Sequence, residues 1–355
     1  METYQIALLE GDGIGPEVVR PAVEVLETAA RRRGGFQFEF LPYAAGATEY
    51  LRSGTPLPDA TLEGCAAADA TLLGAMGLPS VRWPSGTEMA PQLDLREQLD
   101  LFSGVRPIYL YNAAHSPLKR YEKGEIDFVI FRENTEGMFA SRKNPADLAA
   151  SEGRDTLLVT RFATERICRE AFLLARKRRK HVTLVDKANV LPSMAFFRSV
   201  FQSVAEEFPE VQTDKVYVDA AALFLVKNPH RFDVLVMENL FGDILSDLAA
   251  GLVGGMGMAP SGDIGSKHAV FQPSHGSAPD IAGKGIANPV ATILSAAMML
   301  DWLGGEAETT AANDIRAAVS QVMADPANAT HDIGGTKSTD EISALILRAL
   351  EELPA

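Results

Sequence analysis

Cysteine is scarce in this sequence. Only Cys65 and Cys168 occur among the 355 residues, and they lie far apart in the chain. A pair so widely separated indicates neither a disulfide framework nor a zinc site. We therefore expect both thiols to be buried as small apolar side chains in a protein of the reducing cytoplasm.

Long apolar runs are also missing. The most apolar stretch, near residues 293–300, is too short to span a bilayer. The N-terminus has no charged-then-apolar signal pattern and soon reaches a predicted strand at residues 4–9. These features predict a soluble, cytoplasmic protein with no membrane partner.

Positive charge is in deficit, because 33 lysines and arginines stand against 47 acidic residues, for a net charge of −14. No basic stripe offsets this charge, which argues against nucleic acid as a partner. The one basic run, residues 176–180, is interpreted as a solvated helix end. An acidic protein that binds an anionic substrate must concentrate positive charge locally, so clustered arginines are of interest.

The segment pattern predicts an α/β fold. The chain is long enough for two domains or one large α/β unit. Apolar, β-branched segments alternate with segments whose apolar residues have helical spacing, which favours a largely parallel sheet. The predicted strands cover residues 4–9, 70–73, 126–131, 157–161, 181–185, 216–218 and 232–237, and predicted helices cover residues 165–175 and 290–303.

A glycine-rich turn follows the first predicted strand. Residues 11–17 read Gly-Asp-Gly-Ile-Gly-Pro-Glu. The spacing is not the G-x-G-x-x-G of a Rossmann fingerprint, and no acidic residue follows the next strand as that fingerprint requires. We therefore reject a Rossmann fold and predict a tight turn, with Pro16 in the first turn of a helix.

Two aspartates are candidate metal ligands. Asp243 and Asp247 follow the predicted strand 232–237 and lie four apart in a helix, on one face and away from an apolar stripe that includes Ile244. Stacked carboxylates repel each other unless a cation lies between them, and Mg²⁺ and Mn²⁺ prefer oxygen ligands. The alternative is a solvated helix start, which explains Asp243 through the helix dipole but does not require Asp247.

Further charged residues follow or flank predicted elements. Arg96, Arg106 and Arg132 lie near element ends, where α/β proteins place their sites. A lone arginine is usually a surface residue, but three together suggest a clamp for carboxylates, which arginine binds bidentately. Lys187 and Asp219 also come directly after predicted strands.

A long segment near the C-terminus has little periodicity. Residues 271–289 are rich in small side chains and precede the predicted helix 290–303. Long loops of this kind in compact domains are usually functional, and small residues allow the backbone to approach a ligand closely. We predict a ligand-binding loop.

Taken together, these motifs resemble the β-decarboxylating dehydrogenases, the family of isopropylmalate, isocitrate, homoisocitrate, tartrate and D-malate dehydrogenases. The resemblance covers the full chain and rests on residues 11–17, 132–137, 186–190, 239–247 and 275–289. It implies a two-domain isopropylmalate/isocitrate dehydrogenase-like α/β fold that binds NAD without a Rossmann domain.

The resemblance also implies a domain organisation. A discontinuous cofactor-binding domain would comprise residues 1–99 and 252–355. Residues 100–251 would form the metal- and substrate-binding domain, with the dimer interface and an arm near residues 140–160. The protein would be a homodimer whose sites are shared between subunits.

Site roles follow from the same resemblance. The carboxylate clamp would consist of Arg96, Arg106 and Arg132. The ligands of Mg²⁺ or Mn²⁺ would be Asp243, Asp247 and Asp219 of the partner subunit. The metal would favour the alkoxide and then act as electron sink as CO₂ leaves. Lys187 of the partner subunit would be the general base, since a nearby cation lowers the pKa of a lysine.

The cofactor loop of the family corresponds to residues 275–288, with adenine near His275 and Asn288. The implied NAD contacts are His275, Gly276, Ser277, Ala278, Asp280, Ile281, Asn288 and Asn189. Asp280 would accept the ribose 2′-hydroxyl and repel the 2′-phosphate of NADP. NADP-using members carry Lys-Tyr where this chain has Asp280 and Ile281, so NAD is favoured.

The chain departs from the family pattern at two places. The family usually has a tyrosine where this chain has Phe139, so the hydroxyl expected to protonate the enol carbon is missing. Isopropylmalate enzymes place two leucines just before Arg96, but this chain offers Gln92 and Leu93. Isocitrate enzymes place a serine and an asparagine there, but this chain offers Ala90 and Gln92.

We therefore predict NAD- and divalent-metal-dependent oxidative decarboxylation of a 3-substituted malate, a small 2-hydroxy diacid. The first candidate is 3-isopropylmalate, and the alternatives are D-malate, tartrate and isocitrate. A non-catalytic regulatory subunit is the alternative of another class. Such members lose the metal carboxylates or the lysine, and this chain keeps them.

Overall fold

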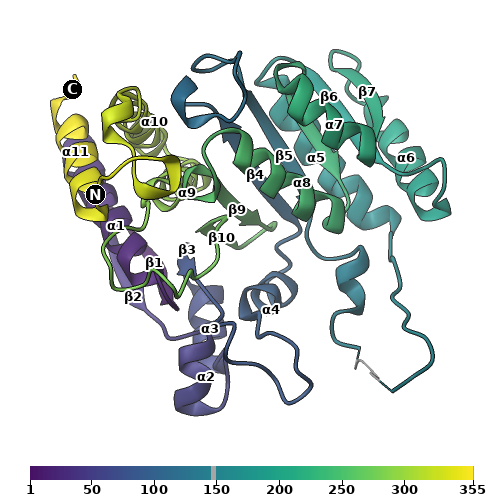
Figure 1. Cartoon of the computed structure of the whole chain (residues 1–355), viewed down its shortest axis with the longest axis horizontal. Helices are drawn as coiled ribbons and strands as arrows, with labels where there is room; N and C mark the ends of the chain where they lie inside the picture. Colours follow the sequence, from purple (N-terminus) through teal and green to yellow (C-terminus); the bar gives the residue numbers. More distant parts are fainter. Residues whose placement is uncertain (145–148, 355) are drawn as a thin grey trace.

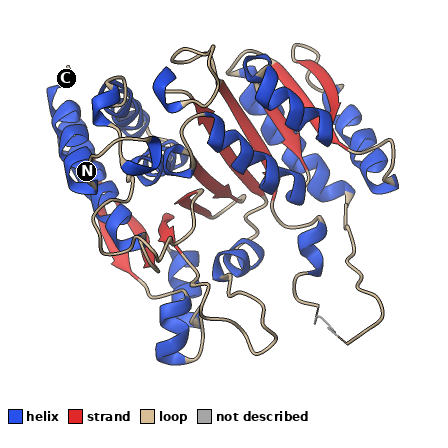
Figure 2. Ribbon diagram, in the orientation of Figure 1, coloured by secondary structure: helices blue, strands red, loops and turns tan. Residues whose placement is uncertain are grey.

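One twisted sheet forms the centre of the molecule (Figures 1 and 2). The computed structural model describes residues 1–144 and 149–354. Within these residues, ten strands pair in the order β2-β1-β3-β10-β9-β4-β5-β8-β6-β7. The strands are β1 (Glu2–Gly11), β2 (Phe36–Pro42), β3 (Ala70–Ala75), β4 (Ser103–Tyr109), β5 (Asp127–Glu133), β6 (His181–Asp186), β7 (Gln212–Tyr217), β8 (Val234–Met237), β9 (Pro260–Ile264) and β10 (Ala269–Pro273).

The sheet is parallel toward both edges and antiparallel in the middle. The pairs β10–β9, β9–β4 and β4–β5 are antiparallel, and the remaining neighbours run parallel. Strand-to-helix alternation brings parallel strands together by crossover connections, whereas β9 and β10 are adjacent in sequence and form a hairpin. The predicted α/β class with a largely parallel sheet is confirmed.

Helices cover both faces of this sheet (Figure 2). They are α1 (Gly15–Arg33), α2 (Ala47–Ser53), α3 (Asp59–Ala67), α4 (Pro91–Gln98), α5 (Arg161–Arg176), α6 (Pro192–Ala205), α7 (Val218–Lys227), α8 (Asn239–Leu252), α9 (Val290–Leu303), α10 (Glu306–Val322) and α11 (Thr339–Glu352). Short 3₁₀ turns are η1 (Ala113–His115), η2 (Met138–Ser141), η3 (Pro229–Arg231), η4 (Met256–Met258), η5 (Pro326–Asn328) and η6 (His331–Ile333). No helix in the described ranges is long and apolar enough to cross a membrane.

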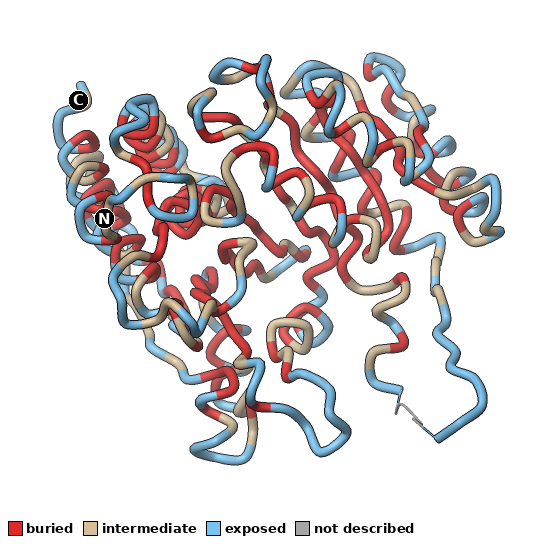
Figure 3. Tube along the Cα trace, viewed as in Figure 1, coloured by how far each residue is buried: buried red, intermediate tan, exposed pale blue. Residues whose placement is uncertain are grey.

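The strands of the middle segment are buried on both faces (Figure 3). In β5, Phe128 and Ile130 pack with α7 and α8, and the alternate residues Val129 and Phe131 pack with α5 and α6. Side chains of a strand point alternately to opposite faces, so this strand reads as a continuous apolar run. At the other end of the sheet, α1, α9, α10 and α11 share one large apolar cluster.

Three sequence expectations are corrected by the structure. Residues 157–161 are not a strand: Leu158 makes a single bridge to Gly137, and α5 begins at Arg161. Ile244 is not on the buried stripe of its helix, because 58% of its surface is exposed. The loop predicted from residue 271 begins later, after β10 ends at Pro273. The predicted arm near 140–160 includes residues 145–148, which lie outside the described residues.

Candidate active site

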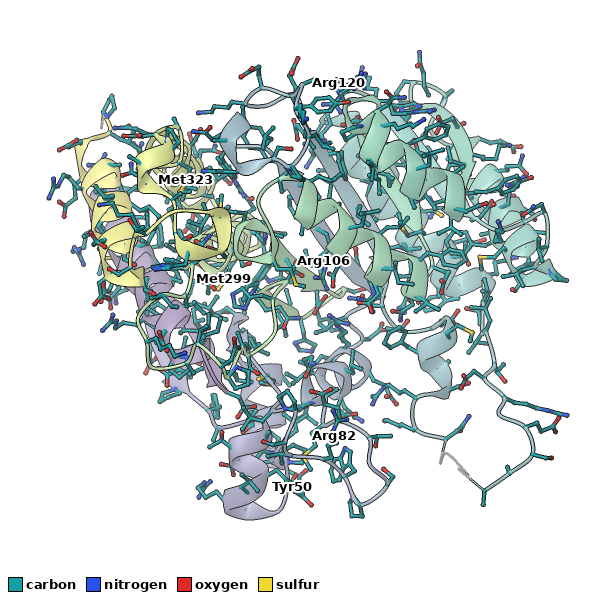
Figure 4. All side chains as sticks on the ribbon, in the orientation of Figure 1. Tyr50, Arg82, Arg106, Arg120, Met299 and Met323 are labelled. Carbon is teal, nitrogen blue, oxygen red and sulfur yellow. The ribbon has the colours of Figure 1, made fainter. Side chains whose placement is uncertain are left out.

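A cavity of about 260 Å³ opens beside the middle of the sheet. It brings together side chains from α4, β4, β5, η2, α8 and the segment that follows β10. Arg106 of β4 lies near the centre of the molecule in Figure 4. The lining residues are Ala75, Met76, Gln92, Leu93, Arg96, Arg106, Arg132, Phe139, Asp243, Asp247, Gln272, Pro273, Ser274, His275 and Gly276.

The three predicted arginines meet in this cavity, and all are buried. Nη1 of Arg106 donates to Oγ of Ser274 at 2.9 Å, while Nε of Arg106 is buried without a hydrogen-bond partner. Burial lowers the pKa of Arg132 to about 9, and the charge of Arg96 lowers it further. The group is still protonated at neutral pH. Three cations in one small cavity favour an anionic ligand with more than one acidic group.

A buried carboxylate, Asp263 of β9, supports the clamp. It accepts hydrogen bonds from Arg96 at 2.9 Å, Asn134 at 2.8 Å and Gln272 at 2.6 Å. Burial alone would raise the pKa of Asp263, but the charges of Arg96 and Arg106 outweigh it and lower the pKa. Sequence reasoning missed this residue. A lone aspartate between small and apolar residues of a short strand is a weak signal, but it was the available one.

The motif at residues 132–137 is a hydrogen-bonded network. Nε and Nη2 of Arg132 donate to Oδ1 of Asn239 at 2.9 and 2.6 Å, and Nδ2 of Asn239 donates to the carbonyl of Glu136 at 2.9 Å. Glu133 accepts from the backbone N–H groups of Thr135 and Glu136. These bonds hold the Arg132 side chain, so its orientation is fixed before a ligand binds.

The two predicted metal carboxylates also line the cavity. Asp243 and Asp247 are one turn apart on α8, whose start is capped by Glu238 through the N–H groups of Leu240 and Phe241. Burial raises the pKa of Asp247, and the negative charge of Asp243 raises it further. Asp243 forms an ion pair with Arg132. A cation near Asp247 would relieve this repulsion, so the pair fits a hard divalent ion.

One chain provides only part of a metal site. Within residues 1–144 and 149–354, no group of three or more His, Cys, Asp or Glu residues is arranged to hold a metal ion. Asp219, the third predicted ligand, does not line the cavity. Its Oδ1 accepts a hydrogen bond of 2.7 Å from Nζ of Lys187, and this bond lowers the pKa of Asp219. The structure therefore pairs Lys187 with Asp219, away from Asp243 and Asp247.

The wall beside Arg96 is of mixed polarity. Gln92 and Leu93 at the start of α4 line the cavity, together with Phe139 of η2. Oε1 of Gln92 is buried and has no hydrogen-bond partner. The guanidinium of Arg132 lies 5.2 Å from the ring centroid of Phe139, a distance typical of a cation–π contact. The two departures from the family pattern thus border the same space.

The predicted cofactor loop enters the cavity at one end. His275 and Gly276 line it, and Nε2 of His275 is buried without a partner, so it can contact a ligand. Burial lowers the pKa of His275, which keeps the ring neutral at pH 7. Ser277 is buried and bonded to the carbonyl of Gly77, and Ala278 adopts a left-handed backbone with φ of 37°.

The remaining predicted cofactor residues lie farther along the loop or in another turn. Asp280 is exposed, and Ile281 packs with the apolar cluster at the start of α1. Asn288 is buried, and its Nδ2 donates to Oδ2 of Asp332 at 3.1 Å. Asn189 is exposed in the turn after β6, next to the Lys187 pair.

The glycine-rich turn at residues 11–17 supports this loop. The N–H of Ile14 donates to the carbonyl of Ser277 at 2.8 Å, and a side chain at Gly13 would clash with that carbonyl. Glu17 accepts from the N–H groups of Gly283 and Gly285. The structure thus gives the turn a supporting role beyond the predicted change of direction, and no sequence signal had indicated these bonds.

Comparison with known proteins identifies the family. Residues 5–346 match the isocitrate/isopropylmalate dehydrogenase family. The chain belongs to this family. It is 46% identical to a 3-isopropylmalate dehydrogenase of Moorella thermoacetica over 98% of this chain and 99% of the relative. An isocitrate/homoisocitrate dehydrogenase of Thermus thermophilus is 44% identical over 99% of both chains.

A solved structure of the same family has the same fold. The isocitrate dehydrogenase of Methylococcus capsulatus superimposes with a TM-score of 0.88 and 38% identity, over 98% of this chain and all of the other. Membership in the isocitrate/isopropylmalate dehydrogenase family makes this protein an oxidative, decarboxylating dehydrogenase. The near-equal identities to relatives with different names leave the substrate to the chemistry of the cavity.

Proposed function

We propose that this protein catalyses the NAD- and divalent-metal-dependent oxidative decarboxylation of a 3-substituted malate, with 3-isopropylmalate as first candidate. The observation that carries the proposal is the convergence of three buried arginines and two stacked aspartates on one cavity. Arginines bind the carboxylates of a diacid, and the aspartates suit a cation that contacts the hydroxyl.

Each charged side chain has a part in this reaction. Arg96, Arg106 and Arg132 bind and orient the substrate carboxylates. Asp243 and Asp247, with Asp219 of the partner subunit, would hold Mg²⁺ or Mn²⁺, which when bound supplies Lewis-acid stabilisation of negative charge on oxygen. Lys187 of the partner subunit accepts the proton of the C2 hydroxyl.

NAD would bind along the loop from His275 to Asn288. The unpartnered Nε2 of His275 and the open backbone at Gly276 suit a ligand at the cavity end of this loop. The exposed carboxylate of Asp280 disfavours a 2′-phosphate, because two anionic groups would repel each other.

A homodimer would complete the site. Leu223 and Val226 of α7 and Ile244 of α8 are large apolar side chains at 43–58% exposure, and the two helices pack together. Burial of this surface against a second copy would be favourable. We propose that residues 100–251 provide this interface and that residues 1–99 and 252–355 form the cofactor domain. The buried free thiols are compatible with a cytoplasmic location.

The activity is tested by NADH formation over a panel of 2-hydroxy diacids, with and without Mg²⁺ or Mn²⁺. The panel comprises 3-isopropylmalate, D-malate, tartrate and isocitrate. Metal-dependent turnover of one of them supports the proposal. A regulatory subunit would turn over none of them, and that result would refute it.

Site sharing is tested by mixing two inactive variants. Lys187→Ala and Asp247→Asn should each be inactive as homodimers. In a mixed dimer one of the two sites keeps both native groups, so random mixing should restore about a quarter of wild-type activity. If the mixture stays inactive although mixed dimers form, the shared site is wrong.

A further inference from the structure

A second cavity, of about 360 Å³, lies between β4, α9 and α10. We name it the tyrosine cavity. Its volume falls in the range of small-molecule sites. It is lined by Pro107, Tyr109, Tyr111, Asp127, Pro260, Leu294, Met298, Arg316, Ala317 and Ser320.

The tyrosine cavity lies on the opposite face of the sheet from the active site. Side chains of β4 alternate, so Arg106 points into the active-site cavity while Pro107 and Tyr109 line the tyrosine cavity. Tyr109 pairs in register with Asp127 of β5, which lines the same cavity. One strand thus contributes to both cavities, and an occupant of the second would contact β4 as well as α9 and α10.

Most of this lining is apolar, and its polar groups are mainly unused donors. The rings of Tyr109 and Tyr111 form an edge-to-face pair with centroids 4.8 Å apart. Tyr111 is 8% exposed. Within the described residues, the hydroxyls of Tyr109, Tyr111 and Ser320 have no hydrogen-bond partner. Such nearly buried hydroxyls are stabilised by a ligand that offers acceptor oxygens.

The charges of the cavity favour an anion. Asp127 accepts from Nη2 of Arg178 at 2.8 Å and also lies 3.8 Å from Arg179, so its negative charge is neutralised by groups of the protein. Arg316 bonds to Asp301 through its Nη atoms, and its Nε remains without a partner. Arg316 and Ser320 lie one turn apart on α10, on one face of the helix.

We propose that the tyrosine cavity binds a small apolar monocarboxylate. The carboxylate oxygens accept hydrogen bonds from Nε of Arg316 and from the hydroxyls of Tyr111 and Ser320. A branched or aromatic body packs against Leu294 and Met298. The site is separate from the proposed substrate site, which has three arginines for a diacid.

The probe is isocaproate, titrated calorimetrically into the full-length protein. A dissociation constant on the order of 1 mM is expected for a ligand of this size. Isocaproamide, which has the same shape without the charge, should bind about tenfold more weakly. No detectable binding of isocaproate would overturn the proposal.

Paired variants locate the binding. Ala317→Trp fills the tyrosine cavity from an exposed helix position, and Leu93→Trp fills the active-site cavity. The proposal requires Ala317→Trp to raise the dissociation constant at least about tenfold and Leu93→Trp to leave it unchanged. Arg316→Gln should weaken binding about tenfold with the apolar lining intact. Loss of binding only in Leu93→Trp would place isocaproate in the active site and refute the proposal.

Discussion

Replacing Gln92 by leucine should change which C3 substituent the enzyme prefers. Oε1 of Gln92 is buried in the cavity wall without a hydrogen-bond partner. A substrate with a polar substituent can satisfy this oxygen or the adjacent amide N–H. An isopropyl group cannot, and it would also displace any water that does so.

The size of the effect follows from these contacts. A buried polar atom left without a partner costs about 1–3 kcal/mol, and each methylene removed from water contributes about 0.8 kcal/mol. We therefore expect Gln92→Leu to favour 3-isopropylmalate over D-malate or tartrate by about 1.5–3 kcal/mol. At about 1.4 kcal/mol per factor of ten, the ratio of kcat/KM values should rise about 10- to 100-fold.

The assay compares kcat/KM for 3-isopropylmalate with kcat/KM for D-malate and tartrate in wild type and variant. Gln98→Leu is the matched control, because Gln98 is an exposed residue of the same helix that does not line the cavity. Its ratio should equal that of the wild type. If Gln92→Leu also leaves the ratio unchanged, residue 92 does not face the substituent, and this account of the pocket is wrong.

Three further predictions concern the same site. Asp247→Asn should reduce metal-dependent NADH formation by at least about 100-fold with little change in melting temperature; full activity of the variant after EDTA treatment would contradict the metal role. NAD should be preferred over NADP because of Asp280, and equal kcat/KM values for the two cofactors would disprove this. Phe139→Tyr should speed turnover of the true substrate, by up to about 100-fold if protonation is limiting; slower turnover would show that the substituent packs on the phenyl ring.

Local patterns were sufficient for much of the fold. The predicted helix 290–303 has the bounds of α9, and the strand at residues 181–185 lies within β6. Both segments are buried and bounded by clear turn signals. The strand predicted at residues 157–161 was wrong, because a β-branched, apolar run also suits the extended chain that leads into Thr160, the cap of α5.

Ile244 shows where periodicity alone misleads. It has the helical spacing of a core residue but lies exposed on α8 beside Asp243. Helical spacing indicates which residues share a face, but it does not indicate what covers that face. We interpret this exposure as part of a subunit interface, and the mixing experiment tests that interpretation.

The sequence by itself determined the family, the largely parallel α/β class and the residue types of the site, because short motifs and apolar periodicity are local properties of the chain. Only the tertiary structure decided that Arg96, Arg106 and Arg132 meet in one cavity. It also decided that Asp263 supports Arg96 and that Lys187 pairs with Asp219 instead of Asp243. These contacts join residues far apart in sequence through the register of the sheet, and register depends on the packing of the whole core.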